Sequence, residues 1–160
     1  MSNQFSNNDR VRRPDYTIPY MPQKESVNFL SWCNLNLVAE DNKTPRIHYE
    51  MLDVILSPEK RVQAIVHRGG AKTTVLNTKL TLYVASLGYM PNFTNKDGEI
   101  QAIKNMMIFS GSEEQAIGLL EEIVFMWENS EVLQQTLTLE KATKKNARFR
   151  NEKGDIMYIQ

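Results

Sequence analysis

The chain has 160 residues, 41% hydrophobic and 24% charged, which suits a single domain with a buried core. Lysine plus arginine (19) balance aspartate plus glutamate (19), so net charge neither favours nor excludes a nucleic-acid partner. The one cysteine, Cys33, excludes an internal disulfide and indicates a reducing compartment, and its place on the apolar face of an expected helix favours a core position. No apolar run reaches the roughly 20 residues that cross a bilayer. Because the N-terminus is too polar for a signal peptide, the sequence predicts a cytosolic protein.

Residues 1–24 are predicted to form a flexible arm ahead of a domain over residues 25–160. The arm is rich in Asn, Ser and Gln, and three prolines follow Arg10, Arg12 and Arg13. Such a segment buries too little apolar surface to offset its ordering entropy. The alternative is a basic arm that contacts the DNA backbone or a partner subunit.

Two helices are expected next. Ser26 is placed to cap a helix that runs to about residue 38. Thr44 and Pro45 supply the N-cap and first position of a second helix, because the missing N–H of proline is harmless there. Ser57 and Pro58 are expected to end it.

The spacing of the apolar residues changes partway through residues 61–88. Residues 62–66 form a short apolar run typical of a strand. From Leu76 onward, apolar residues recur at i, i+4, i+7 and i+11, which indicates a helix. Gly88 then provides the residue of positive φ that commonly follows a helix end.

The turn between this strand and this helix carries the residue types of a phosphate-binding P-loop. The candidate nucleotide-binding residues are Gly69, Gly70, Ala71, Lys72, Thr73 and Thr74. Glycines let backbone N–H groups surround phosphates, Lys72 is expected to reach the β- and γ-phosphates, and the Thr73 hydroxyl to complete a Mg²⁺ shell. The strict pattern G-x-x-x-x-G-K-[ST] fails at Val66 and Ala71, so a strand–turn–helix joint with a solvated lysine remains an alternative.

The rest of the chain completes an α/β pattern. Its expected parts are a hydrophilic connection over 90–105, a buried strand over 106–109, a helix over 112–127, a further helical turn over 131–136 and a hairpin over 147–160. Ser112 and Gln115 have the spacing of a capping box. Trp127 is expected to pack in the core. Strands alternating with helices predict a parallel sheet flanked by helices, of the P-loop NTPase kind.

A metal-holding carboxylate is missing from this pattern. Phosphoryl transfer needs an acidic residue at the end of a second core strand, whereas residues 106–109 are followed by Ser110-Gly111-Ser112. Asp155 precedes its apolar run instead of following it. His48 and His67 have no partners at metal-ligand spacing. The sequence therefore contains the residues with which an ATPase binds nucleotide, but not the carboxylate that holds the metal ion for hydrolysis.

Three stretches together resemble the large terminase subunit of tailed bacteriophages. They are Pro45–Leu52, similar to the helix before that family's P-loop, His67–Thr74, similar to the P-loop itself, and Met107–Ala116, similar to its second strand and Ser-x-x-x-x-Gln-Ala helix start. Terminase P-loops depart from the strict pattern, with an arginine four residues before the lysine and sometimes an alanine directly before it. Arg68 and Ala71 match those departures, and the likeness runs from about residue 44 to 160.

The resemblance implies an ATP-driven motor that moves double-stranded DNA into a procapsid. It implies ATP and Mg²⁺ as cofactors, with Lys72 on the β- and γ-phosphates, Thr73 on the metal and Arg68 as the catalytic arginine that senses the γ-phosphate. The helix near His48 and Tyr49 would help to form the adenine pocket. The implied partners are DNA, a small terminase subunit and the portal protein, with a homo-oligomeric ring when complete and no membrane. The implied location is the host cytoplasm, with transient docking at the procapsid portal.

The family's ATPase domain continues to an acidic metal motif and a nuclease domain, neither of which lies in these 160 residues. The chain is therefore expected to have weak or no ATPase activity by itself, whether it is a fragment, a split-gene product or is completed by a partner. One alternative function is a non-catalytic fragment that binds terminase, portal or DNA partners. Another is a helicase-like P-loop translocase.

Overall fold

A computed structural model describes residues 19–37, 44–58 and 73–160 of the chain. Along these residues the elements are α1 (Lys24–Asn36), α2 (Arg46–Ile55), the π-helix η1 (Thr73–Lys79), α3 (Leu80–Leu87), β1 (Tyr89–Thr94), β2 (Ile100–Ala102), β3 (Asn105–Met106), α4 (Glu113–Glu128), α5 (Glu131–Thr136), β4 (Leu137–Ala142), β5 (Ala147–Asn151) and β6 (Ile156–Ile159). The strand predicted over 62–66 lies outside the described residues. Within the described ranges, every helix is too short or too polar to cross a bilayer.

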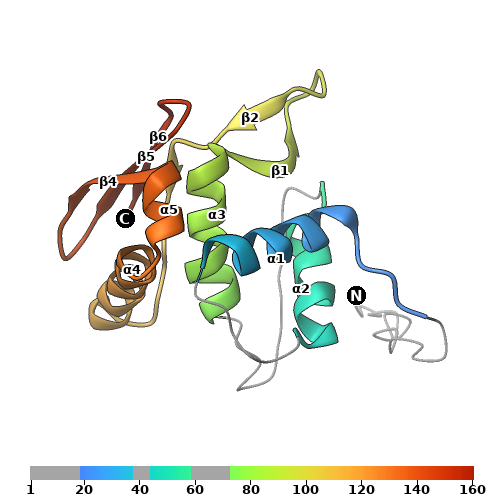
Figure 1. The fold of residues 1–160 in the computed structure, drawn as a ribbon, viewed down its shortest axis with the longest axis horizontal. Coiled ribbons are helices and arrows are strands. Elements are labelled where there is room, and N and C mark those ends of the chain that lie inside the picture. The colour runs from blue at the N-terminus through green and yellow to red at the C-terminus, as the bar shows by residue number, and fades with distance from the viewer. Residues whose placement is uncertain (1–18, 38–43, 59–72) are drawn as a thin grey trace, which may run out of the picture.

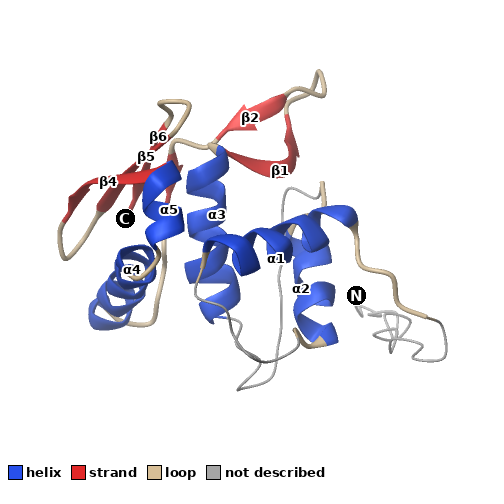
Figure 2. Ribbon diagram, viewed as in Figure 1, coloured by secondary structure: helices blue, strands red, loops and turns tan. Residues whose placement is uncertain are grey.

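The central element is α3, which lies between two groups of secondary structure. Helix α1 packs on one side of it, with α2 against α1, and the sheet with α4 and α5 lies on the other side (Figures 1 and 2). All six residues from Leu80 to Ala85 are buried, so this helix has no water-facing stripe over its first six residues. A helix that is buried all round needs neighbours on every side, which is what the two groups provide.

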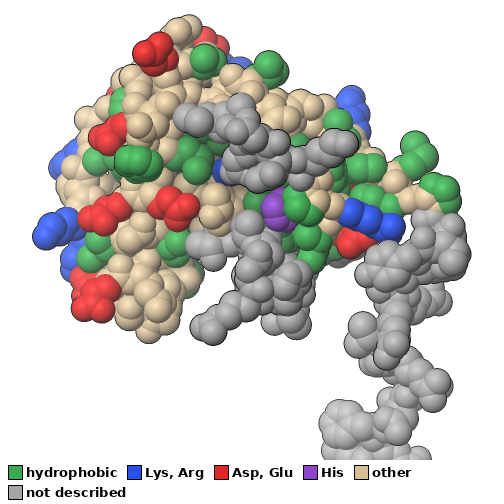
Figure 3. Space-filling view, turned by 60° about the horizontal axis from the view of Figure 1, so that its bottom comes forward, with side chains coloured by type: hydrophobic (Ala, Val, Ile, Leu, Met, Phe, Trp, Pro, Cys, Tyr) green, Lys and Arg blue, Asp and Glu red, His purple; other side chains and the backbone are tan. Residues whose placement is uncertain are grey.

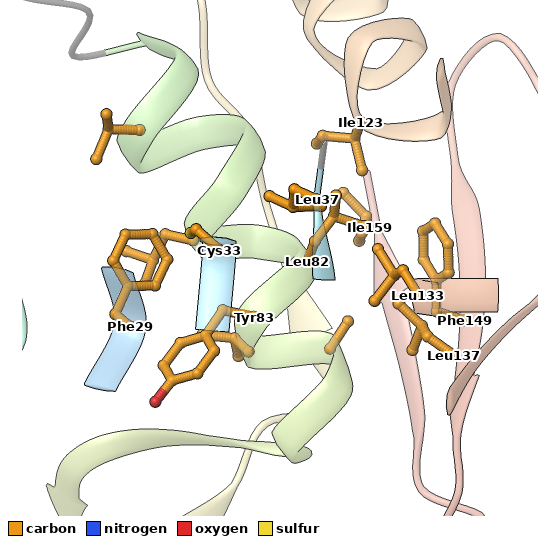
Figure 4. Packing of buried hydrophobic residues seen from close by; sticks show 14 of the residues in the cluster. Phe29, Cys33, Leu37, Leu82, Tyr83, Ile123, Leu133, Leu137, Phe149 and Ile159 are labelled. Carbon is orange, nitrogen blue, oxygen red and sulfur yellow. The ribbon is translucent and has the colours of Figure 1, made fainter. Parts of the chain in front are cut away.

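Aromatic contacts join α1 to α3. The rings of Phe29 and Trp32 lie 5.2 and 5.3 Å from the ring of Tyr83, the first in an edge-to-face arrangement. Cys33 is buried beside them, so its predicted core position is confirmed (Figure 4). Edge-to-face aromatic pairs add a fraction of a kcal/mol, up to about 1.5 kcal/mol, beyond the area they bury.

Helix α4 and the sheet form the second half of the core. Trp127 packs its ring 6.3 Å from Phe149 of β5 and donates its indole N–H to the carbonyl of Leu137 at 2.6 Å. The predicted packing role of Trp127 is thus confirmed. Ile123, Leu133 and Leu137 are fully buried in this half of the core, with Leu133 and Leu137 close to Phe149 (Figure 4).

The main sheet is mixed, with strand order β3-β6-β5-β4. Only β3 and β6 run parallel, while β6 with β5 and β5 with β4 are antiparallel. The general α/β class is confirmed, but an all-parallel sheet is wrong for the described strands. The reason is the short turns between β4, β5 and β6, since a turn of a few residues can join only antiparallel neighbours.

Several local predictions hold. Ser112 caps α4 by accepting the Gln115 N–H at 3.2 Å, a helix runs over 131–136, and the C-terminal hairpin forms as β5 and β6. The capping box is half made, because the Gln115 side chain accepts from the Ser110 hydroxyl at 2.9 Å. Gly88 has φ of 79°, as predicted for the residue that ends the helix.

The predicted N-caps of the first two helices are wrong by one to three residues. Gln23 occupies the N-cap of α1, while Ser26 lies inside the helix, buried, with its hydroxyl donating to Asp53 of α2 at 2.5 Å. Pro45, not Thr44, occupies the N-cap of α2. In the first case the half-buried carboxylate of Asp53 takes the serine hydroxyl in place of the backbone.

Two predictions for the middle of the chain need correction. The segment over 90–105 is not a plain connection, because it contains the antiparallel hairpin β1–β2. The apolar run over 106–109 is not a buried strand: only its first residue belongs to β3, and Met107 and Phe109 are 62% and 83% exposed. The continuous apolar pattern suggests cover on both faces, but the described helices cover one face only (Figure 2).

Gly88→Ala is expected to destabilise the fold by about 2 to 4 kcal/mol, because an added Cβ would meet the Asp155 carboxylate at 2.7 Å in addition to the left-handed backbone strain. Gly98→Ala is the matched control: its φ is 81°, yet nothing lies within 4 Å of the added carbon, so about 1 to 2 kcal/mol is expected. Urea denaturation of both variants measures the difference. Equal losses would contradict the close approach of Asp155 to Gly88.

Tyr83→Phe is expected to flatten the loss of stability at alkaline pH. Burial raises the pKa of Tyr83 from 10 to about 12, so folding gains stability below the unfolded pKa and loses it as pH rises through the folded one. The free energy of unfolding should therefore fall less between pH 10 and 12 in the variant than in the wild type. Tyr20, whose pKa is also raised by burial, leaves a residual slope of the same sign. Urea titrations at several pH values give both slopes, and identical slopes would argue against this burial.

Candidate functional site

The structure describes only part of the predicted phosphate-binding segment. Arg68, Gly69, Gly70, Ala71 and Lys72 lie outside the described residues. Thr73 and Thr74 are the first two residues of η1, which runs directly into α3. The helix that the P-loop interpretation requires after Lys72 is present from the first described residue of this segment, Thr73.

The direction of this helix is fixed by its contacts with β3. At its carboxyl end, the Gly88 carbonyl accepts the N–H of Ile103, at 2.9 Å. Near the start of α3, the Thr81 hydroxyl lies 3.0 Å from the sulfur of Met106. The helix and β3 therefore run in opposite directions, and Thr73, eight residues before Thr81, lies farther toward the side of the carboxyl end of β3.

The carboxyl ends of two parallel strands share that edge of the sheet. The ladder between them continues past β3 and β6, since Gln160 donates to the carbonyl of Met106 at 3.0 Å and accepts from the N–H of Ile108 at 2.8 Å. The chain then turns through residues 110–112 into α4, which packs against η1. The amino ends of η1 and α4 therefore lie at the carboxyl edge of the parallel pair, where ligands of open α/β sheets bind.

The acidic groups at this edge belong to the first turn of α4. The Glu113 carboxylate forms an exposed ion pair with Lys145 at 2.7 Å, and its hydrogen bond to that ammonium group lowers the pKa of Glu113. Glu114 is exposed beside it. Among the described residues, no group of three or more His, Cys, Asp and Glu side chains is placed to hold a metal ion.

Asp155 lies at the opposite end of α3. Its backbone N–H donates to the side-chain oxygen of Asn151 at 2.9 Å, and the amide of Asn151 donates to Asp155 at 3.2 Å and to the carbonyl of Ser86 at 3.3 Å. This network fastens the β5–β6 turn to the carboxyl end of α3. The sequence argument that Asp155 is misplaced for a metal site is consistent with this structural role.

The π-helix η1 is a feature that the sequence did not indicate. Within it Thr78 is fully buried, and its hydroxyl has no hydrogen-bond partner in the described structure. The next hydroxyl along the helix, that of Thr81, donates to the carbonyl of Asn77 at 2.5 Å. Residues Leu76 and Leu80 have the spacing of an ordinary α-helix, so no sequence signal could have found the wider turn. π-Helical segments are rare and are frequently associated with functional sites.

The residues just before α1 contact helix α2. The Tyr20 hydroxyl donates to the carboxylate of Asp53 at 2.5 Å, and the guanidinium of Arg46 lies 4.7 Å above the Tyr20 ring while pairing with Glu50 at 2.7 Å. Burial, with this hydrogen bond, raises the pKa of Tyr20. The predicted arm over residues 1–24 is therefore anchored at Tyr20, and α1 already begins at Lys24.

Tyr49 of α2 packs against the core, and His48 beside it is half-buried. The adenine pocket that the resemblance places near these two residues stays a prediction. Comparison of the chain with protein-family models, with curated proteins and with solved structures gives no match.

Proposed function

We propose that this chain is the ATP-binding part of a viral DNA-packaging motor of the large terminase type. The observation that supports the proposal best is the helix that is present from Thr73 onward and points its amino end toward the carboxyl edge of the β3–β6 pair. Unpaired N–H groups and the positive end of the helix dipole favour phosphate at such a position.

In this proposal the chain's own residues bind and orient the nucleotide. The backbone N–H groups of Gly69 and Gly70 surround the phosphates, while Lys72 neutralises the β- and γ-oxygens. Thr73 contributes its hydroxyl to the Mg²⁺ shell, and the metal ion when bound offsets phosphate charge. Arg68 contacts the γ-phosphate and favours the charge distribution of hydrolysis.

The proposed motor needs further polypeptide for turnover and for its DNA. The metal-holding carboxylate expected after the second core strand is replaced by Ser110-Gly111-Ser112. Next to this position Met107 and Phe109 stay exposed, as expected of a surface that another segment covers. Double-stranded DNA, a small terminase subunit and the portal protein are the partners that the proposal implies, in a ring of copies in the host cytoplasm.

Lys72→Ala is expected to weaken binding of a fluorescent ATP analogue by at least about tenfold, because it removes the cation that neutralises the terminal phosphates. Fluorescence titration with and without Mg²⁺ measures the dissociation constant. Lys96→Ala is the control, since Lys96 is exposed in the β1–β2 turn and carries the same charge. If both variants bind as the wild type does, the P-loop assignment is wrong.

The chain alone is expected to show no ATP turnover above background, even where it binds nucleotide, because a carboxylate for the metal is missing. Release of inorganic phosphate, followed over hours with wild type and Lys72→Ala side by side, provides the measurement. Robust turnover that disappears in Lys72→Ala would contradict the proposed incompleteness while supporting the P-loop.

A second candidate function is a binding module without catalysis, favoured by the exposure of Met107, Phe109 and Tyr158 (62%, 83% and 40%). In that case binding to DNA or to a terminase or portal partner should be unaffected by Lys72→Ala. Removal of residues 1–18 should abolish it if the basic arm is responsible. The deletion ends before Tyr20 because that residue is anchored to Asp53.

A further inference from the structure

The face of the main sheet that points away from α4 is open. Phe149 of β5 packs its ring against Trp127 of α4, and side chains alternate between the two faces along a strand. Arg148 and Arg150, on either side of Phe149, therefore point to the opposite face. Among the described elements, the helices cover only the Phe149 side (Figure 2). A four-stranded sheet with helices on one side leaves its other side-chain surface accessible.

The register of the strands places a row of side chains across this open face. Lys141 of β4 pairs with Arg148 of β5, and Arg148 pairs with Tyr158 of β6. Tyr158 pairs in turn with Asn105 of β3. Directly opposite residues share a face of the sheet, so all four lie on the face that Arg148 occupies. The guanidinium of Arg148 lies 5.4 Å from the centre of the Tyr158 ring, and Tyr158 is 40% exposed. The row thus holds a cation over an accessible aromatic ring.

The apolar part of the open face continues along β3 and the residues after it. Residues 105, 107 and 109 are exposed, whereas Met106 and Ile108 are half-buried, and this alternation assigns the exposed residues to the open face. The ladder with β6 reaches Ile108, whose N–H donates to the carbonyl of Gln160 at 2.8 Å. Phe109, which is 83% exposed, lies about 13 Å along the strand from the row of Tyr158. Two rings at that separation contact different planar groups of one extended ligand.

The open face is positively charged although the chain as a whole has no net charge. Arg148 and Arg150 share one carboxylate, that of Glu140, and Lys141 is exposed beside them. These strand residues therefore carry three positive charges and one negative charge. Acidic side chains gather instead on α4, which has five glutamates and no lysine or arginine. Figure 3 shows acidic side chains among hydrophobic ones on that part of the molecule. A ligand that complements the open face carries negative charge.

We propose that the open face of the β3-β6-β5-β4 sheet binds single-stranded nucleic acid. Its bases stack on Phe109, on Tyr158 and on the guanidinium plane of Arg148. Lys141 and Arg150 contact its phosphates.

A single strand fits this face better than a duplex does. The bases of a duplex are paired and stacked on one another, so they offer no free surface to Phe109 and Tyr158. The site is independent of the proposed nucleotide site, and it goes beyond the proposed motor, whose DNA is double-stranded. A polypeptide segment that covers Phe109 would compete with the nucleic acid for the same face.

The test is fluorescence anisotropy of labelled oligo(dT) and oligo(U) of about 20 nucleotides, titrated with the full chain beside a duplex of the same length. At least one single strand is expected to bind more tightly than the duplex, and preference for oligo(U) would assign the ligand to RNA. Phe109→Ala and Tyr158→Ala should each raise the dissociation constant at least about fivefold, because the stacking of one base is lost. Tyr158→Phe keeps the ring and should bind as the wild type does. Phe125→Ala is the matched control, since Phe125 is 64% exposed on α4.

Salt dependence tests the phosphate contacts separately. Lys141→Ala should weaken binding of every single-stranded sequence and reduce the slope of log K against log salt by about 0.7, the value for one phosphate contact of a single strand. Lys96→Ala removes the same charge from the exposed β1–β2 turn and should leave the slope unchanged.

Removal of residues 1–18 separates the sheet from the basic arm. The shortened chain should still bind a single strand, and Phe109→Ala should still weaken that binding. The proposal is overturned if neither single strand binds, if the duplex binds more tightly, or if binding depends on residues 1–18 and is unaffected by Phe109→Ala. Lys72→Ala should leave binding of the single strand unchanged, so failure here is distinguishable from failure of the P-loop.

Discussion

The burial of α3 on all sides is the constraint on which the rest of the structure depends. Its residues Leu80–Ala85 expose almost no surface, so the helix is stable only when α1, α4 and the strands close around it. This makes the molecule a single packed unit although its sheet and its helical pair share few direct contacts. Fully burying a leucine or valine side chain contributes about 1.5 to 3 kcal/mol, and this short helix carries three of them at 80, 82 and 84.

The same constraint positions the candidate site. Because α3 continues backward into η1, the core that surrounds α3 also fixes where Thr73 lies and which way the helix dipole points. Thr81 holds the helix to Met106 at the carboxyl end of β3, and Gly88 holds it to Ile103 just before the amino end of that strand. A phosphate-binding turn just before Thr73 would therefore be joined to a rigidly packed helix. A binding site needs such packing to keep a fixed geometry.

The sequence predicted the helices and the final hairpin well, because their periodicity and caps are local signals. Gly88 is a good example, since its conformation follows from the helix end alone. The sequence-based predictions were wrong where contacts with distant residues determine the structure. Ser26 donates its hydroxyl to Asp53 instead of capping its helix. Phe109 is exposed because the described elements cover only one face of the sheet. For the site, the sequence predicted the helix from the spacing of Leu76, Leu80 and Tyr83 but gave no sign of the π-helical turn. That turn packs against α4, a contact that the periodicity of η1 cannot encode.

Ser130 links the start of α5 to the end of α1. Its hydroxyl donates to the carbonyl of Asn36 at the end of α1 and accepts from the N–H of Leu133 at the start of α5. Ninety-four residues separate Ser130 from Asn36, so the carbonyl at the end of α1 gains this hydrogen bond only after residue 130 has been synthesised. At ribosomal rates of about 5 to 20 residues per second, that delay is roughly 5 to 20 seconds. The aromatic face of α1 meets Tyr83 earlier, so α1 packs on α3 before its carboxyl end is fixed by Ser130.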